Sequence, residues 1–353
     1  MSQNIQFRID GLYQTLKLEL DRFSAGQKFF SVRQLIERYR SSRRVVEKAL
    51  ARLEGEKQLR IVPASGIFVE ERRRETHVVT LIRCDWPSEY LSGLETKIEQ
   101  AISKHSGWTF SRSLVQPTSR REVAELLAEI HGDAILFALP FQRLRPSDVA
   151  FFLTLPTPVI FLDGNILCDG VNAIDTQPDY SGMLAADFLI RNGHRKLALI
   201  RAEPWSMSLQ RRYLGFINYS RLHGIEPLEI DCCVQSGEAA CAKAHEKVLA
   251  YLNGNGLTFS GCFVSCDYSA FGVISAFKEC GLAVPDDVSV IGAGGVASGA
   301  YTDPPLTTVA EDVDSIARTV CEGLDDLFSG GRFGVRLVPV TLIERKSVKR
   351  INR

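Results

Sequence analysis

Apolar residues recur at three- and four-residue steps through the first 53 positions, and this spacing predicts amphipathic helices. The segment 5–23 carries the first of these stripes, which is made of Ile9, Leu12, Tyr13, Leu16 and Leu20. A turn at residues 24–26 follows, and Ser31 then stands three residues before Gln34, which is the spacing of a capping box. A short second helix is therefore expected to begin after Ser31 and to end by Arg40.

The next apolar stripe predicts a third helix, which Ser42 is placed to cap. Its inward positions are Val46, Ala49, Leu50 and Leu53. These leave five charged side chains for solvent, namely Arg43, Arg44, Glu47, Lys48 and Arg52. The segment 31–53 holds seven basic residues against two acidic ones. A cationic outer face on such a helix is typical of the recognition helix of a helix-turn-helix, although a docking domain with a solvated basic face would share the pattern.

Two short strands, 58–62 and 66–69, are predicted on either side of Pro63-Ala64-Ser65, so a hairpin of the kind called a wing follows the third helix. Together, the runs SVRQLIERYRSSRRVVEKALARLE and RIVPASGIFV resemble the GntR-type winged helix-turn-helix. The resemblance implies double-stranded operator DNA as a partner. The DNA contacts that it implies are Arg33, Ser42, Arg43 and, at the wing tip, Ser65 and Gly66. Arg44 and Lys48 share the exposed face and join these candidates.

Two residues depart from the pattern of that family. Glu47 stands where many members have an arginine, and Ala64 replaces a common glycine of the wing. The operator sequence therefore cannot be taken from a relative.

Beyond residue 76, short apolar runs alternate with amphipathic segments. The runs are 78–82, 134–137, 159–162, 197–200, 261–264 and 288–291. The amphipathic segments are 91–104, 120–130, 180–192, 209–222 and 239–252. Buried parallel strands need helical crossovers of this length, so the pattern predicts an α/β fold with doubly wound parallel sheets. The expected domains are 1–70 for the winged helix-turn-helix, 71–76 for a charged linker and 77–353 for the α/β body.

Ligands of such sheets bind beyond the carboxyl ends of the strands, which directs attention to the loops there. These loops are 85–90, 139–142, 163–165, 203–206, 266–268 and 292–295. Three aromatic side chains in them offer flat apolar faces, namely Trp86, Tyr90 and Trp205, although each could instead pack under its loop. Directional hydrogen bonds are expected from Asp163, Asp267 and Arg212. The set suits a polar, ring-shaped ligand.

Motifs along the body resemble the effector domain of lactose/galactose-type repressors, which is similar to periplasmic sugar-binding proteins. In order, they are GHRK at 193–196, RYLGF at 212–216, CDYSAFG at 266–272, VPDDVSVIG at 284–292 and PPLTTV at 304–309. The resemblance implies two lobes joined by three crossings, a ligand between the lobes and a homodimer formed through the body. It also implies that Arg212 grips ligand hydroxyls and that Asp163 contacts the ligand from the first lobe. Both resemblances together are those of arabinose-repressor-like transcription regulators.

The expected pocket departs from the second family at two positions. Gly294 stands where an aspartate is common, and Cys266 replaces a frequent asparagine. Both changes remove polar contacts to sugar hydroxyls, yet a sugar or sugar derivative remains the expected effector. Asp267 has two open roles, because it could cap the helix that follows or contact the ligand.

Charge separates the two parts of the chain. The net charge is zero, but residues 1–76 carry 16 Lys and Arg against 10 Asp and Glu, so the remainder is acidic. A basic unit of this size suits a polyanionic partner. The hydrophobic fraction of 45% is that of a globular protein. No apolar run approaches the roughly 18 residues of a membrane span, and the first residues lack the pattern of a secretory signal, so a cytoplasmic protein without a membrane partner is expected.

Enzyme classes fit the same residues poorly. A strand running into Gly292-Ala293-Gly294-Gly295-Val296-Ala297 suggests a dinucleotide-binding enzyme, but Pro304 and Pro305 would stop the long helix that the pyrophosphate needs. Hydrolase signatures are absent from the sequence. The nine cysteines are scattered, which favours buried reduced thiols over a metal site. We therefore expect no enzyme, no cofactor and no metal.

The sequence thus predicts a ligand-responsive transcription regulator, most simply a repressor, whose effector alters its affinity for operator DNA. A sugar-binding protein of a transport system would share the body. Such a protein, however, would have no use for the basic N-terminal unit.

Overall fold

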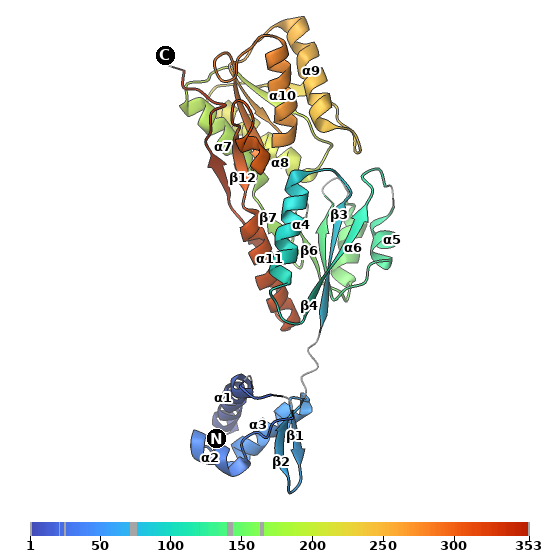
Figure 1. Cartoon of the computed structure of the whole chain (residues 1–353), viewed down its shortest axis with the longest axis vertical. Coiled ribbons are helices and arrows are strands. Elements are labelled where there is room, and N and C mark those ends of the chain that lie inside the picture. The colour runs from blue at the N-terminus through green and yellow to red at the C-terminus, as the bar shows by residue number, and fades with distance from the viewer. Residues whose placement is uncertain are drawn as a thin grey trace. The chain divides into compact units, whose positions relative to one another are not determined.

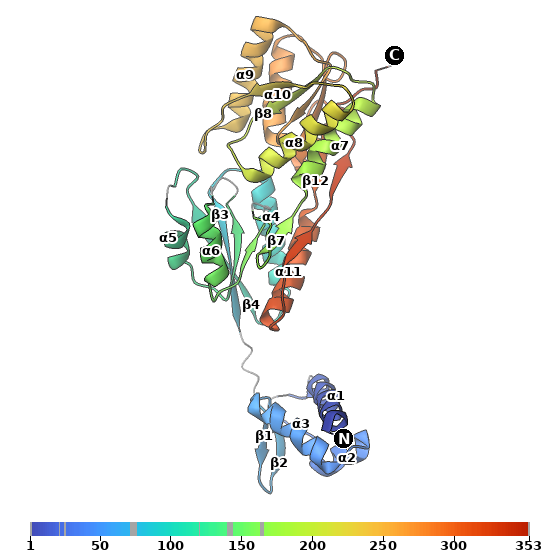
Figure 2. The same cartoon turned by 180° about the vertical axis from the view of Figure 1, so that it is seen from behind.

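The computed structural model describes residues 2–20, 22–24, 26–70, 76–119, 121–139, 144–162 and 166–351. The chain divides into two compact units, Met1–Glu75 and Thr76–Arg353 (Figures 1 and 2). Asp163 and most of the expected linker lie outside the described residues. Among the helices that are described, none is long and apolar enough to span a bilayer.

The first unit has three helices, α1 (Ser2–Leu20), α2 (Val32–Tyr39) and α3 (Arg43–Gly55). All five residues of the first predicted stripe and all four inward positions of α3 are buried, so the periodicity is confirmed. The capping box is also present, because Gln34 N donates to Ser31 Oγ and Ser31 N donates to Gln34 Oε1. Ser42 occupies the N-cap position of α3, but its side chain makes no capping hydrogen bond. That expectation for Ser42 was wrong.

The hairpin of the first unit consists of β1 (Leu59–Val62) and β2 (Gly66–Val69), which pair antiparallel. The chain before α2 lies along β2, because Lys28 forms a bridge to Phe68 and Phe29 N donates to Ile67 O at 2.8 Å. Ala64 at the hairpin tip has a φ of 62°, in the left-handed region. A glycine is favoured there, so Ala64 occupies a strained position.

The second unit begins with a lobe built on a six-stranded parallel sheet, in the order β13-β7-β6-β5-β3-β4. Its strands are β3 (His77–Cys84), β4 (Trp108–Val115), β5 (Ala134–Ala138), β6 (Val159–Phe161), β7 (Asn172–Asp175) and β13 (Val335–Leu337). Its helices are α4 (Glu89–Ile102), α5 (Val123–Ala128), α6 (Pro146–Thr154) and α11 (Val313–Phe328). Helices α4 and α11 lie side by side on one face, and α5 and α6 cover the other (Figure 1).

The other lobe has the sheet order β14-β12-β11-β10-β8-β9, in which only β14 runs antiparallel to its neighbour. Its strands are β8 (Leu197–Arg201), β9 (Leu228–Asp231), β10 (Gly261–Val264), β11 (Ser289–Gly294), β12 (Thr307–Glu311) and β14 (Val340–Ile343). Its helices are α7 (Pro178–Arg191), α8 (Met207–Leu222), α9 (Ala240–Asn255), α10 (Asp267–Glu279) and the short η1 (Ala297–Ala300). Successive residues of β8 and β10 point to opposite faces, so α9 and α10 pack on one face and α7 and α8 on the other (Figure 2).

The chain passes between the lobes three times, from β7 to α7, from β12 to α11 and from β13 to β14. The predicted two-lobed α/β fold with doubly wound sheets is confirmed. All nine cysteines are free thiols, and only Cys168 and Cys233 are exposed.

Candidate DNA-binding face and ligand site

The outer face of α3 carries charged side chains, as its periodicity predicts. Among the charged side chains of this face that form an ion pair, Arg43 is the most accessible, with 78% of its side chain exposed. Its Nε lies 2.7 Å from Glu47 Oε1, one helical turn along the same helix. Glu47, which departs from the family pattern, therefore competes with any phosphate for Arg43.

Arg33, Arg44 and Lys48 are exposed and form no ion pair among the described residues. Two other cations of the unit have partners, because Arg38 bonds Glu19 at 2.6 Å and Arg52 bonds Asp10 at 3.0 Å. Within the described part of the chain, Arg44 and Lys48 therefore leave unpaired positive charge in the N-terminal half of α3, and Arg33 adds one on α2.

The wing tip is placed next to a lysine. Gly66 has a φ of 124°, and a Cβ atom added there would lie 2.5 Å from Lys28 Cε. Ser65 N donates to Val62 O, which closes the turn. The glycine therefore leaves room for the Lys28 side chain beside the wing tip.

A cavity of about 180 Å³ lies between the two lobes of the body. Six of the eight predicted ligand residues line it, namely Trp86, Tyr90, Arg212, Cys266, Asp267 and Gly294. Trp205 is not among its lining residues, and Asp163 lies outside the described residues. The lining comes from the carboxyl ends of strands in both lobes, as expected for this fold.

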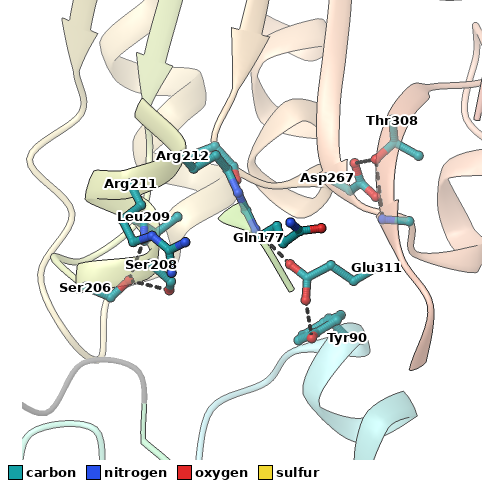
Figure 3. Close-up of polar contacts among 12 residues, drawn as sticks. Tyr90, Gln177, Ser206, Ser208, Leu209, Arg211, Arg212, Asp267, Thr308 and Glu311 are labelled. Carbon is teal, nitrogen blue, oxygen red and sulfur yellow. Dashed lines mark hydrogen bonds and ion pairs between the residues drawn. The ribbon is translucent and has the colours of Figure 1, made fainter. Parts of the chain in front are cut away.

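Arg212 is the central cation of the cavity and is 9% exposed. Its Nη1 donates to Ser265 O, and its Nη2 donates to Glu311 Oε1, both at 2.8 Å (Figure 3). Its Nε is buried and has no hydrogen-bond partner in the described part of the chain. A buried donor without an acceptor is costly, so a ligand atom that accepts a hydrogen bond from this Nε would be stabilising.

Glu311 connects the lobes. It is the last residue of β12, directly before the second crossing, and its Oε2 accepts from the Tyr90 hydroxyl at 2.5 Å (Figure 3). Because Tyr90 belongs to α4 of the first lobe and Arg212 to α8 of the second, the three side chains form a polar chain across the cavity. A second link joins Glu89 of α4 to Ser298, whose backbone N–H and hydroxyl both donate to the carboxylate.

Asp267 does not cap α10, which was one of its two expected roles. Cys266 is the N-cap of α10, and its Sγ accepts from Ser269 N. Asp267 is fully buried and accepts from the Thr308 hydroxyl at 2.6 Å and from Val296 N at 2.9 Å (Figure 3). The capping role predicted for Asp267 was wrong, and its carboxylate instead ties α10 to β12 and to the loop after β11.

Cys266 also donates to a second acidic residue, Glu203. The thiol lies 2.6 Å from Glu203 Oε1, to which the Ser269 hydroxyl donates at 2.9 Å. Burial raises the pKa of the Glu203 carboxyl above its ordinary range, and burial beside Glu203 raises the pKa of the Cys266 thiol. Burial therefore shifts both groups toward their protonated forms.

Gly294 lies at the cavity wall with a φ of 122°. A side chain is strained at this φ, so this backbone favours the glycine that replaces the common aspartate. A Cβ atom added at Gly294 would lie 3.8 Å from Asp267 Oδ2, which is an ordinary contact distance, so the backbone conformation and not crowding favours glycine here.

Helix α8 is held close to α7 by two glycines. A Cβ atom on Gly182 would lie 2.0 Å from Arg212 O, and one on Gly215 would lie 2.0 Å from Asp179 O. This approach also lets Arg211 bond both carboxylate oxygens of Asp175, at 3.0 and 3.1 Å. Adjacent arginines thus hold two crossings, Arg211 the first and Arg212 the second.

Sequence reasoning did not select Glu311 or Glu203 for the cavity. The rule of strand ends could have found Glu311, because it closes β12, but that strand was not among the predicted ones. Glu203 lay inside a predicted loop, where only its burial reveals a role. No group of three or more His, Cys, Asp or Glu side chains in the described residues could hold a metal ion.

Comparisons with known proteins match both units. Residues 9–69 match the gntR family of bacterial regulatory proteins, and residues 186–348 match the periplasmic binding protein-like domain. The Lactose operon repressor of Escherichia coli K12 is 26% identical over 263 residues, which cover 74% of this chain and 70% of that protein. The PurR repressor of Aliivibrio fischeri MJ11 is 30% identical over 169 residues, but only 47% of this chain and 49% of that protein are covered.

Solved structures share the fold of the body. A dimeric Lac repressor with a C-terminal deletion has a TM-score of 0.67 at 24% identity, and a LacI family regulator from Enterococcus faecium with bound ribose has one of 0.65 at 22%. Each match covers 78% of this chain and 100% of the other. The matched relatives are transcription repressors and not enzymes. The chain is therefore a DNA-binding transcription regulator that joins a gntR-family helix-turn-helix domain to a ligand-binding domain of the LacI/PurR repressor type.

Proposed function

We propose that a sugar or sugar derivative binds in the cavity between the lobes and thereby sets the affinity of the N-terminal domain for operator DNA. The observation that carries this proposal is the polar chain Tyr90–Glu311–Arg212, which joins both lobes at a crossing beside an unsatisfied Arg212 Nε. A ligand hydroxyl that accepts from this Nε would act on the chain directly. Trp86 and Tyr90 supply aromatic surface for a sugar ring.

The proposed assembly is a homodimer formed through the body. It would present two copies of α3 to half-sites in successive major grooves. Arg33, Arg44 and Lys48 would contact phosphates or base edges, with Arg43, Ser42, Ser65 and Gly66 beside them. Because its partner is operator DNA, we place the protein in the cytoplasm.

The coupling between ligand and DNA requires two arrangements of the lobes. An effector shifts their populations only through unequal affinity for the two, and such differences are typically about 1–3 kcal/mol. Arg211 on Asp175 and Arg212 on Glu311 would transmit the change to two crossings. An effector that prefers the DNA-binding arrangement promotes operator binding, and one that prefers the other arrangement releases the operator.

Two single variants test the division of labour. A duplex selected from a randomised pool by the full-length protein serves as the operator, and a sugar found by thermal shift serves as the effector. Arg43→Ala is expected to weaken duplex binding and to leave sugar affinity unchanged, whereas Arg212→Ala should do the reverse. Equal loss of both activities in either variant would contradict the proposal, as would failure of the wild-type protein to bind any duplex at low salt.

A further inference from the structure

Carboxyl groups surround the cavity between the lobes. Glu89 stands at the start of α4, Glu203 follows β8, Asp267 opens α10 and Glu311 ends β12. Arg212 is the single arginine or lysine among the described lining residues. The lining as a whole is therefore acidic, although it comes from four separate elements.

The one guanidinium of the lining is already neutralised. Arg212 Nη2 lies 2.8 Å from Glu311 Oε1, and both side chains are about one-tenth exposed. Its Nη1 is occupied by Ser265 O, so the edge that could form two parallel bonds to a carboxylate or phosphate is divided between other acceptors. The remaining Nε can donate a single hydrogen bond, which suits a hydroxyl or carbonyl oxygen.

Helix N-termini are the other common anion sites of a protein, and three of them open onto this cavity. Each is already capped by a side chain. Ser88 Oγ accepts from Leu91 N of α4, Ser206 Oγ accepts from Leu209 N of α8, and Cys266 Sγ accepts from Ser269 N of α10. The first turns of α4 and α10 also contain Glu89 and Asp267, whose charges occupy the favourable end of the helix dipole.

Burial increases the cost of adding negative charge here. The pKa of the Glu203 carboxyl and that of the Asp267 carboxyl are both raised, with burial as the largest cause. The cavity therefore already disfavours the charges that its own residues carry. A phosphate or carboxylate on a ligand would meet the same unfavourable environment, and would face four carboxyl groups as well.

The geometry points to an effector that carries no negative charge, a neutral or amine-bearing polyhydroxy compound rather than the corresponding acid or phosphate ester. This inference rests on the proposed function, because it concerns the ligand of the same cavity. It narrows the expected sugars and sugar derivatives to those that carry no negative charge. Selection arises from the charges of Glu89 and Glu311 and from the burial around Glu203 and Asp267, which disfavours any added negative charge. It does not depend on which sugar stereochemistry fits.

The test uses matched sets of compounds that share one carbon skeleton. For galactose, glucose, ribose and arabinose, the neutral sugar is compared with its available amino, acid and phosphate derivatives, by thermal shift and calorimetry on the full-length protein. In the set that binds, the acid and the phosphate are expected to bind at least about tenfold more weakly than the neutral or amino member. Tighter binding of an acid or a phosphate overturns this inference and leaves the proposed function standing. Absence of binding by every member of every set overturns the proposed sugar effector and this inference with it.

A gain of binding provides the second test. Glu311→Gln removes one negative charge from the cavity and keeps an oxygen that can accept from Arg212 or Tyr90. We expect the affinity for the anionic member of the binding set to rise about tenfold relative to that for the neutral member. Misfolding cannot mimic a gain in affinity. Glu226→Gln removes the same charge from an exposed pair with Arg221 outside the cavity, and should leave the ratio unchanged. An unchanged ratio in Glu311→Gln would overturn the inference.

Discussion

Each of the two units of this protein pairs a glutamate with an arginine to which we assign a role in the proposed function, and the two pairs lie in opposite environments. In the first unit, Arg43 and Glu47 lie one helical turn apart on an exposed face, at 2.7 Å. In the body, Arg212 and Glu311 are 99 residues apart in sequence, meet at 2.8 Å, and are nearly buried. Water and salt screen the first pair, whereas the second pair cannot lose one member without leaving an unsolvated charge.

This difference indicates which charged residues can be substituted without loss of stability. The charges of the DNA-binding face can be altered with little consequence for folding, so that face can vary its affinity for DNA. In the proposed function, the Arg212–Glu311 pair would serve both stability and ligand binding. Variants that remove or free one member of each pair should therefore have very different effects.

The largest effect is expected when the buried pair is broken. Arg212→Met leaves the Glu311 carboxylate in the cavity without its guanidinium, and such losses cost about 3–5 kcal/mol. Unfolding of the body in urea, followed by tryptophan fluorescence, would measure the change. The effector should also no longer alter operator affinity.

Two further variants sharpen this prediction. Arg221→Met breaks an exposed pair with Glu226 and should cost no more than about 1 kcal/mol. Arg212→Met combined with Glu311→Leu should recover most of the stability but none of the response to effector. A loss below about 1 kcal/mol in Arg212→Met alone would show that the pair is not structural.

The next effect comes from the contact that positions this arginine. Gly215→Ala would place a Cβ atom 2.0 Å from Asp179 O, so α7 and α8 must separate. Forcing packed elements apart in this way costs about 1–3 kcal/mol. The midpoint of thermal unfolding should fall, and effector affinity should fall with it.

A second glycine serves as the control. Gly254 lies in α9 with nothing within 4 Å of an added Cβ atom, so Gly254→Ala should be neutral or should stabilise the protein by up to about 1 kcal/mol. Equal destabilisation by both variants would refute the close approach of α7 and α8 as the cause.

A smaller change is expected when the exposed pair is opened. Glu47→Gln frees Arg43 for phosphate, so affinity for duplex DNA should rise severalfold and the slope of log K against log salt should steepen by about 0.9. Fluorescence anisotropy across a salt series would measure both. Asp10→Asn also removes one negative charge, but its partner Arg52 lies in the C-terminal half of α3 and keeps a second ion pair with Glu56. An equal gain in both variants would mean that net charge, and not the position of Arg43, controls binding.

The smallest effect concerns pH. His194 is fully buried, its ring contacts Ser260 Oγ and Lys349 O, and burial lowers its pKa below the ordinary value. The neutral form is favoured in the folded state, so the unfolded chain binds more protons as the pH falls below about 6.5. The free energy of unfolding should therefore decline as the pH falls below about 6.5, and it should keep its full value above that pH. His194→Gln should flatten the decline in a series of urea titrations, and a decline of unchanged size would exclude His194 as its source.

The sequence predicted correctly many of the elements whose structure depends on residues close to one another in the chain. The stripe from Ile9 to Leu20 predicted α1, and the Ser31–Gln34 spacing predicted its capping box, because both depend on residues within one or two helical turns. The central strands of both sheets, such as β5 and β10, were evident as apolar runs because helices cover both of their faces.

Strands at the edges were less evident. In β4 the residues are half-buried or exposed, so its sequence WTFSRSLV is mixed in polarity and did not stand out. The helix expected at 120–130 is shorter, spanning Val123–Ala128. Helix α11 was not predicted either. It follows β12 of the second lobe in the chain and packs beside α4 on the first lobe.

By itself, the sequence determined the division into two units, the periodic helices of the first unit and the α/β character of the second. It also identified most of the residues that reach the cavity, because all of these features depend on local spacing or on motifs. Only the tertiary structure decided that Glu311 bonds both Arg212 and Tyr90, that Asp267 ties α10 to β12, and that Glu203 is buried beside Cys266. These contacts join residues far apart in the chain, and whether a carboxylate is solvated, paired or protonated depends on what folding brings next to it.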